Sequence, residues 1–169
     1  MKVLGIVALS CVLMPAIPQE AWSGEDASVV PRPVSQAAEP AVRWAVAGAR
    51  RRLEQPACQS LFSEFSDASG RMLQSNLDAL GHSGADHLGL IVFADGSDRQ
   101  RCKVAGPLAF TTAGSGVVYV CGRVFRDLAK RDPRLVQAIL IHEMLHTLGL
   151  GENPPTSLEI TERVLAACR

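Results

Sequence analysis

The feature that most constrains this chain is an apolar stretch, residues 135–151, which reads LVQAILIHEMLHTLGLG. Apolar side chains would occupy nearly the whole circumference of the helix that this stretch predicts, so we expect the helix to be buried at the centre of the fold. Three polar residues interrupt it, namely His142, Glu143 and His146. Burying such groups is costly unless they are hydrogen-bonded, paired or coordinated. The fold must therefore supply partners for all three.

The spacing of these residues predicts a metal site. His142 and His146 are four residues apart, so both imidazoles lie on one face of the helix and can bind one zinc ion. Glu143 lies beside them, where it can take a proton from a zinc-bound water. The pattern therefore predicts zinc-dependent hydrolysis of a peptide bond. The alternative is structural: hydrogen bonds within the core satisfy both histidines, and Glu143 is one of the partners.

The run that starts at His142 resembles the motif of the zincin metallopeptidases and is closest to the metzincin form, H-E-x-x-H-x-x-G-x-x-H/D. His142, Glu143, His146 and Gly149 match this form, whereas position 152 is Glu instead of His or Asp. In that family the glycine turns the chain so that the third ligand returns to the metal. The resemblance therefore implies one Zn²⁺ per chain, held by His142, His146 and Glu152, with Glu143 as the general base.

Two glutamates further along the chain are alternative third ligands. By resemblance, gluzincins take this ligand from a following helix, where this chain has Glu159 and Glu162. Glu159 also has a structural interpretation, because Thr156, three residues before it, completes a capping-box pattern. His82 and His87 precede the first predicted strand in a loop, and we expect them to face solvent.

The predicted elements favour an α+β fold. Hydrophobic periodicity predicts helices and β-rich runs predict strands. The helices are expected over 41–54, 58–65, 71–80 and from Pro133 into the HExxH motif, and the strands over 88–93, 106–112 and 117–121. A hairpin loop is expected at 113–116, and a short helix or irregular link at 124–130. We therefore expect a zincin-like α+β domain whose small, mostly antiparallel or mixed sheet packs on helices around a central HExxH helix.

The resemblance also raises expectations about the substrate cleft. No methionine follows Met144 and little chain follows the motif, so we expect no Met-turn and an open, shallow cleft. In zincins a strand beside the cleft pairs with the extended substrate, and residues 117–121 are the candidate here. Tyr119 is either an oxyanion-stabilising group or an ordinary strand residue. Residues 95–98, Asp-Gly-Ser-Asp, predict a polar turn more strongly than a calcium loop.

The N-terminus has the pattern of a secretory signal peptide. Residues 1–23 combine a basic start, an apolar run and a small-x-small end. The alternatives are a buried core helix and a lipoprotein anchor at Cys11, although the apolar run before Cys11 is short. Residues 24–40, rich in proline and small polar residues, predict a disordered lead-in, and 41–169 a single domain. We expect the mature protein to be secreted or periplasmic.

Four cysteines lie outside the predicted signal peptide: Cys58, Cys102, Cys121 and Cys168. An even number in an exported chain favours two disulfides, with three possible pairings. We favour Cys102 with Cys121, which would staple neighbouring strands, and Cys58 with Cys168, which would tie the start of the folded region to its last helix. The alternatives are four free thiols and a four-cysteine zinc site, for which the C-x2-C spacing is missing.

Composition excludes other classes of function. The 169 residues include 17 basic and 17 acidic side chains, so the chain lacks the basic footprint of nucleic-acid-binding proteins. No later stretch reaches the roughly 20 apolar residues of a membrane span. The expected partner is a peptide or protein substrate, and the oligomeric state is not indicated. Two other functions fit the same residues: a non-catalytic, zinc-stabilised secreted binding or structural module, and a cell-wall amidase.

Overall fold

The HExxH helix, α8 (Pro133–Thr147), lies at the centre of the fold in a computed structural model that describes residues 31–104 and 106–169. The helix begins as predicted. The Asp132 side chain accepts a hydrogen bond of 3.0 Å from the backbone N–H of Leu135, and a proline occupies the first helical position. The predicted signal peptide lies outside the described residues.

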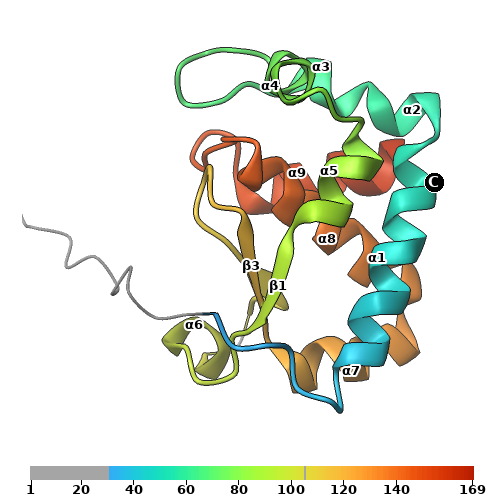
Figure 1. Cartoon of the computed structure of the whole chain (residues 1–169), viewed down its shortest axis with the longest axis vertical. Helices are drawn as coiled ribbons and strands as arrows, with labels where there is room; N and C mark the ends of the chain where they lie inside the picture. The colour runs from blue at the N-terminus through green and yellow to red at the C-terminus, as the bar shows by residue number, and fades with distance from the viewer. Residues whose placement is uncertain (1–30, 105) are drawn as a thin grey trace, which may run out of the picture. The chain divides into compact units, whose positions relative to one another are not determined.

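Helices pack against α8 along its length. They include α1 (Glu39–Leu53), α7 (Gly122–Arg131) and α9 (Ser157–Ala167), as Figure 1 shows. Because these neighbours and the sheet surround α8, its residues are buried all the way from Leu140 to Thr147. The expectation of a central, buried HExxH helix is therefore confirmed.

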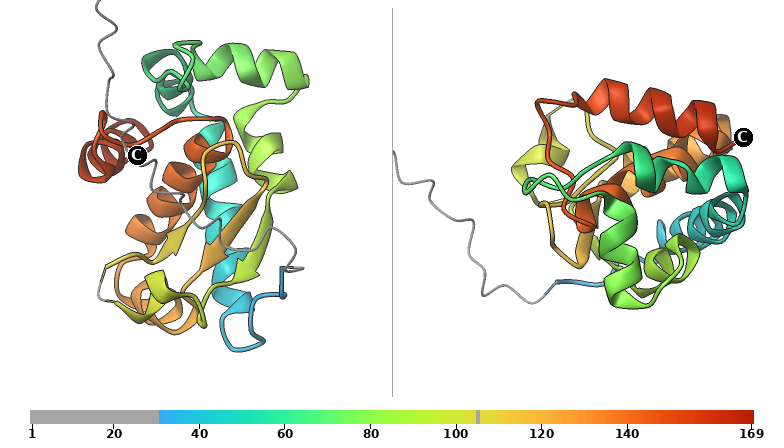
Figure 2. Two further views of the ribbon diagram at one scale, coloured as in Figure 1. Left: turned by 90° about the vertical axis from the view of Figure 1, so that its left-hand side faces the viewer. Right: turned by 90° about the horizontal axis from the view of Figure 1, so that it is seen from above.

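A small mixed sheet completes the α+β architecture. It contains β1 (Val92–Asp95), β2 (Ala109–Phe110) and β3 (Val117–Val120), in the order β1-β3-β2. β1 and β3 are parallel, whereas β2 and β3 are antiparallel and joined by the predicted hairpin loop. Figure 2 shows the sheet lying alongside α8 and α1. The predicted fold class, a small mixed sheet packed on helices, is confirmed.

β3 is the central strand, and this corrects one expectation. Val118 and Val120 point into the hydrophobic core, so Val117 and Tyr119 lie on the opposite face of the sheet. Because β1 pairs with the whole of β3 and β2 pairs with Tyr119 and Val120, β3 is not an edge strand to which a substrate strand could be added. The prediction that residues 117–121 pair with substrate is therefore wrong, and the edges of the sheet are β1 and β2.

The predicted strand at 88–93 is partly helical. Helix α5 (Gly84–Leu90) occupies its first half, and β1 starts only at Val92. The cause is a cap: the Ser83 hydroxyl accepts a hydrogen bond of 3.1 Å from the Asp86 N–H and donates one of 2.7 Å to the Asp86 carboxylate. These two hydrogen bonds start a helix that continues into residues whose composition is typical of a strand. Four more helices are short: α2 (Pro56–Gln59), α3 (Leu61–Glu64), α4 (Leu73–Leu80) and α6 (Gln100–Lys103).

Both favoured disulfides are present. Cys58 and Cys168 join α2 to the end of α9 across a sequence separation of 110 residues. Cys102 and Cys121 are 19 residues apart and join α6 to the residue that follows β3. Cys102 therefore lies on a short helix and not on the strand that we expected. The first bridge fastens α9 to the rest of the fold, and the second fastens α6 to the sheet.

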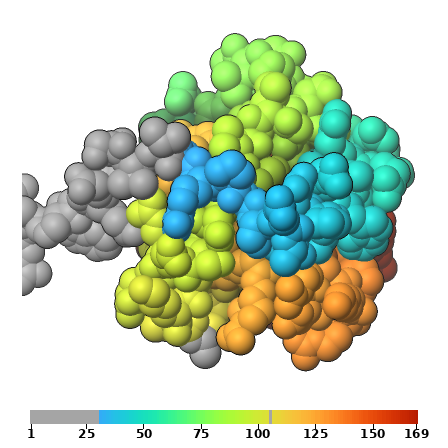
Figure 3. All heavy atoms as spheres, turned by 60° about the horizontal axis from the view of Figure 1, so that its bottom comes forward, coloured from blue at the N-terminus to red at the C-terminus, as the bar shows by residue number. Residues whose placement is uncertain are grey.

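Residues 31–38, part of the predicted disordered lead-in, contact β1. Pro33 forms an isolated bridge with Ala94, and the Arg32 carbonyl accepts a hydrogen bond of 2.8 Å from Asp95. Figure 3 shows this segment in blue, lying against the yellow-green residues near position 100. The predicted domain boundaries stay a prediction. Within the described ranges, no helix has the length and apolar character needed to cross a bilayer.

Candidate metal centre

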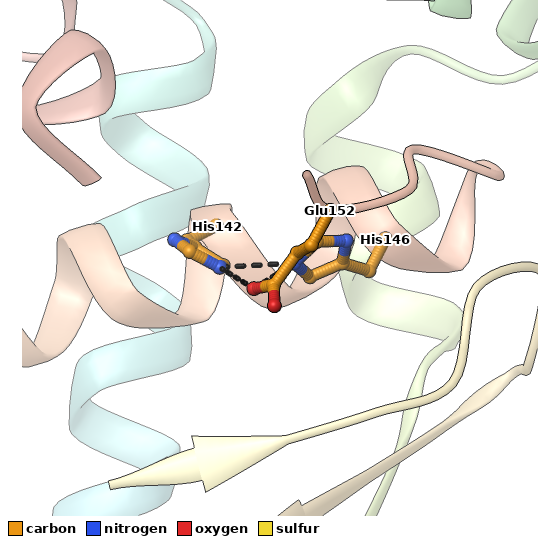
Figure 4. A group of neighbouring side chains, drawn as sticks. All are labelled: His142, His146 and Glu152. Carbon is orange, nitrogen blue, oxygen red and sulfur yellow. Dashed lines mark hydrogen bonds and ion pairs between the residues drawn. The ribbon is translucent and has the colours of Figure 1, made fainter. Parts of the chain in front are cut away.

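Three side chains converge at the C-terminal end of α8. His142 and His146 come from the helix itself, and Glu152 comes from the loop that follows it (Figure 4). The two Nε2 atoms are 3.0 Å apart, and a Glu152 carboxylate oxygen lies 3.8 Å from Nε2 of His142 and 3.4 Å from Nε2 of His146. This is the one group among the described residues whose geometry could hold a metal ion.

The second nitrogen of each histidine is held by an oxygen. Nδ1 of His142 lies 2.9 Å from the Thr161 hydroxyl, which donates its own proton to the Ser157 carbonyl and therefore accepts from the ring. Nδ1 of His146 donates a hydrogen bond of 2.7 Å to the Leu150 carbonyl. Both rings therefore carry their proton on Nδ1, which leaves both Nε2 lone pairs free to bind a metal.

The spacing of the three atoms fits a tetrahedral ion. With metal–ligand bonds of about 2.0–2.2 Å, tetrahedral geometry puts ligand atoms about 3.3 Å apart, and the three separations lie around this value. Two imidazole lone pairs that face each other at 3.0 Å repel unless a cation lies between them. Two nitrogens and a carboxylate oxygen are also ligands that zinc accepts. The donor set therefore fits a zinc ion with one open coordination position.

Charge on His142 does not explain its place in this cluster. Burial, followed by the neighbouring His146, lowers the pKa of His142 to about 3. Its ring is therefore neutral at neutral pH, and its approach to Glu152 is not an ion pair. A metal ion would give the two buried histidines of α8 the compensation that their burial requires.

Gly149 turns the chain so that Glu152 reaches the histidines. Its φ of +103° lies in a region that side-chain-bearing residues rarely adopt, and its N–H donates a hydrogen bond of 2.9 Å to the His146 carbonyl. A Cβ at this position would lie 3.0 Å from the Cβ of Asp67. The turn that the resemblance implied is therefore present, and both its backbone angle and its close packing require glycine.

Asp67 and Asn76 hold this turn from the other side. The Asn76 amide donates hydrogen bonds of 2.9 Å to the Leu148 carbonyl and 3.1 Å to the Asp67 carboxylate. Asp67 also forms a backbone bridge with Leu150. Hydrogen bonds from Ser69 and then from Asn76 hold the pKa of Asp67 well below its usual range. Residues 67–70, Asp-Ala-Ser-Gly, have the composition of a local turn, but no local signal connects them to a loop about eighty residues later.

Glu143 lies beside the metal group and is 6% exposed. Burial, and then the charge of Glu152, raise the pKa of Glu143 to about 8. Arg101 and the backbone N–H of Thr111 act in the opposite direction. A carboxylate with a raised pKa has a high proton affinity, and Glu143 is close enough to Glu152 for the charge of that ligand to act on it.

The other candidate residues lie elsewhere. Glu159 forms the predicted capping box, with its carboxylate 2.7 Å from the Thr156 N–H, and neither it nor Glu162 belongs to the metal group. His87 is on α5 and not in a loop, and its Nε2 donates to the buried Thr147 hydroxyl at 2.9 Å. His87 is therefore half-buried and hydrogen-bonded where a solvent-facing side chain was expected, and neither it nor His82 belongs to the metal group.

Two polar features of the sheet also have structural roles. Tyr119 stacks on Phe110, and its hydroxyl lies 3.3 Å from the Arg99 guanidinium. This agrees with the reading of Tyr119 as a strand residue. Asp95 accepts a hydrogen bond of 2.9 Å from the Ser97 N–H, which closes the polar turn that the sequence predicts.

Comparisons with protein-family models, curated proteins and solved structures found no match to this chain. Any functional assignment must therefore rest on the residues of the candidate metal centre and on their geometry.

Proposed function

We propose that this protein is a zinc-dependent metallopeptidase in which His142, His146 and Glu152 hold the metal and Glu143 is the general base. One observation carries the proposal: both histidines are fixed with Nδ1 as the donor, and both Nε2 atoms converge with a carboxylate at metal-ligand spacing. A hydrogen-bonded histidine pair in the core would need a proton between the Nε2 atoms, and both ring protons are already used elsewhere.

Zinc and the residues around it would have separate roles in hydrolysis. Zinc, when bound, would polarise the peptide carbonyl and make water more acidic. Glu143 would accept a proton from the attacking water and pass it to the leaving amine. The Thr111 N–H would keep the Glu143 carboxylate oriented. The charge of the ion would also lower the pKa of Glu143 and keep it ionised for this role.

The donor set favours a catalytic site over a structural one. Structural zinc sites are closed by four protein ligands, whereas catalytic sites have three and keep one position open. Three groups converge here among the described residues, and the Glu152 side chain is 42% exposed, so one side of the site is accessible to solvent. A non-catalytic zinc-stabilised module would have no use for a buried Glu143 next to the ligands.

Export of the protein is part of the proposal. Two disulfides favour an oxidising compartment, and residues 1–23 have the pattern of a signal peptide. Together they support a secreted or periplasmic enzyme that acts on a peptide or protein substrate.

The zinc content of the purified protein, measured by elemental analysis, tests the site. We expect about one zinc per chain, lost in His146→Ala and strongly reduced in Glu152→Ala. Matched controls are His82→Ala and Glu162→Gln, which should keep the metal. If the folded, oxidised protein takes up no zinc when zinc is added, the metallopeptidase proposal is wrong.

The role of Glu143 is tested separately from metal binding. Glu143→Ala should keep its zinc and lose peptide cleavage by a factor of roughly 10² or more. Cleavage is followed by mass spectrometry on a mixture of unrelated peptides and on peptide fragments of a bacterial cell wall. Cleavage of the cell-wall fragments alone would indicate the amidase. Bound zinc without any cleavage, in the wild type as in the variant, would indicate the non-catalytic module.

A further inference from the structure

Cations and aromatic rings are layered on the outer face of the sheet, next to the proposed active site. The Arg101 guanidinium carbon lies 5.5 Å from the centre of the Phe110 ring. Phe110 stacks on Tyr119 with ring centres 5.4 Å apart, and Arg99 lies over Tyr119 at 4.7 Å. The result is a platform of two rings that carries two guanidinium groups.

This platform is fixed in place. The disulfide between Cys102 and Cys121 joins α6 to the residue after β3, so Arg101, within α6, and Arg99, its N-cap residue, belong to a covalently anchored helix. A Cβ at Gly96 would lie 3.1 Å from the Cys102 sulfur and 3.3 Å from the Phe110 ring, which shows how tightly the layer is packed. Figure 3 shows the yellow-green residues near position 100 at the surface. A group held this way loses little conformational entropy when it binds a ligand.

Arg101 lies at the edge of the proposed active site. Phe110, on which it stacks, belongs to the edge strand β2, which contacts α8. The next residue, Thr111, donates its backbone N–H to Glu143, and the charge of Arg101 itself acts on Glu143. Arg101 and Glu143 are therefore both linked to the edge strand β2, the first through the Phe110 ring and the second through Thr111.

Arg101 forms no close ion pair in the described part of the chain, although its charge acts on Glu143. The nearby cation Arg32, by contrast, is paired with Asp98. Its side chain is exposed. An exposed guanidinium stacked on a ring presents its N–H groups in the planar arrangement that a carboxylate accepts.

We propose that Arg101, supported by Phe110, is a subsite that binds a carboxylate group of the substrate, so that the enzyme prefers acidic peptides. The proposal builds on the proposed peptidase function. The carboxylate can be an acidic side chain or the C-terminal carboxylate of a peptide, because both have the same chemistry. Arg101 is a specificity-determining residue here and not a member of the proton-transfer machinery.

Binding of matched peptides tests this subsite without relying on catalysis. Three peptides of one sequence are compared: one with Glu and an amidated C-terminus, one with Gln and a free C-terminus, and one with Gln and an amidated C-terminus. Their affinities for the zinc-loaded Glu143→Gln protein are measured by fluorescence anisotropy. We expect at least one of the carboxylate-bearing peptides to bind about tenfold more tightly than the neutral one. The first two peptides distinguish a side-chain carboxylate from a terminal one.

Substitutions assign the preference to Arg101. Arg101→Ala should abolish it, Arg101→Lys should keep part of it, and Arg101→Glu should instead favour a peptide with Lys at the Glu position. The matched control is Arg163→Ala, which removes an arginine that also lies 5.5 Å from a ring, that of Phe65, but on α9. This control should keep the full preference.

The outcomes separate the two proposals. Equal binding of the three peptides by the Glu143→Gln protein with Arg101 intact would overturn the subsite. This holds even if the wild-type enzyme cleaves all three. A carboxylate preference that survives Arg101→Ala would also overturn it. A preference that Arg101→Ala abolishes supports the subsite, whether or not the wild-type protein cleaves the peptides, and failure to cleave any of them would count against the peptidase alone. A fall in kcat that is equal for all peptides, with no change in binding, would make Arg101 a transition-state group and overturn its role as a subsite.

Discussion

At the scale of single residues, two oxygen atoms determine which nitrogen of each histidine is free to bind a metal. The Thr161 hydroxyl and the Leu150 carbonyl accept the Nδ1 protons of His142 and His146, so both lone pairs point at the same place. Thr161 lies outside the sequence motif, and Leu150 occupies one of the positions that the motif leaves unspecified. The motif therefore defines which residues can bind a metal, whereas the surrounding chain defines with which atom they do so.

Thr161→Val should weaken zinc binding by about 10–100-fold. The variant removes the acceptor for the His142 Nδ1 proton, so the proton can move to Nε2, where it blocks the metal. Zinc affinity is measured by competition with a chromogenic chelator. Thr161→Ser, which keeps the hydroxyl, should bind zinc as the wild type does. An unchanged affinity in Thr161→Val would show that this hydrogen bond does not set the tautomer.

The candidate ligands could be predicted from the sequence, but their supports could not. The HExxH spacing and Gly149 are local patterns with a known physical reason, and so is the capping box that occupies Glu159. Asp67 and Asn76 are ordinary turn and helix residues in the sequence. They matter only because the fold brings them to a loop about eighty residues away, and a single sequence carries no signal for such a contact.

At the scale of elements, the loop after α8 depends on a single backbone conformation. Gly149→Ala should destabilise the protein by about 1–3 kcal/mol, because alanine is strained at this φ and its Cβ would press on Asp67. The displaced loop should also carry Glu152 away from the histidines and weaken zinc binding. Urea denaturation of the apo and zinc-loaded protein measures both effects.

Gly151→Ala is the matched control for this prediction. It lies two residues along the same loop, is not among the described glycines with positive φ, and has no atoms within 4 Å of an added Cβ. It should be close to neutral. Equal losses in the two variants would show that the loop responds to any added side chain and not to the conformation at Gly149.

The sequence predicts the start of a helix well where there is a clear capping signal. It predicts poorly where a helix and a strand are both compatible with the same residues. α8 and α9 start at the residues that their caps indicate. By contrast, the apolar run at 88–93 predicts one strand. The Ser83 cap instead starts helix α5, which takes up the first half of this run. Short apolar runs fit both periods, so only the cap could have decided between them.

At the scale of the whole molecule, the two disulfides should contribute unequally to stability. In the chain-entropy model, a loop of 110 residues contributes about 5 kcal/mol and one of 19 residues about 3 kcal/mol. Replacing Cys58 and Cys168 by serine should therefore lower the free energy of unfolding more than replacing Cys102 and Cys121. Guanidinium denaturation of the two double variants checks this order, and the reverse order would mean that local packing around α6 outweighs chain entropy.

The order of synthesis follows from where the supports of the metal group lie in the chain. A ribosome makes Asp67 and Asn76 long before it makes Glu152, so the groups that hold the ligand loop exist before the loop does. Thr161 comes later still, on a helix whose end is fastened through Cys168. A chain that has been made only as far as the ligand loop therefore already contains Asp67 and Asn76 but still lacks Glu152, the third candidate ligand.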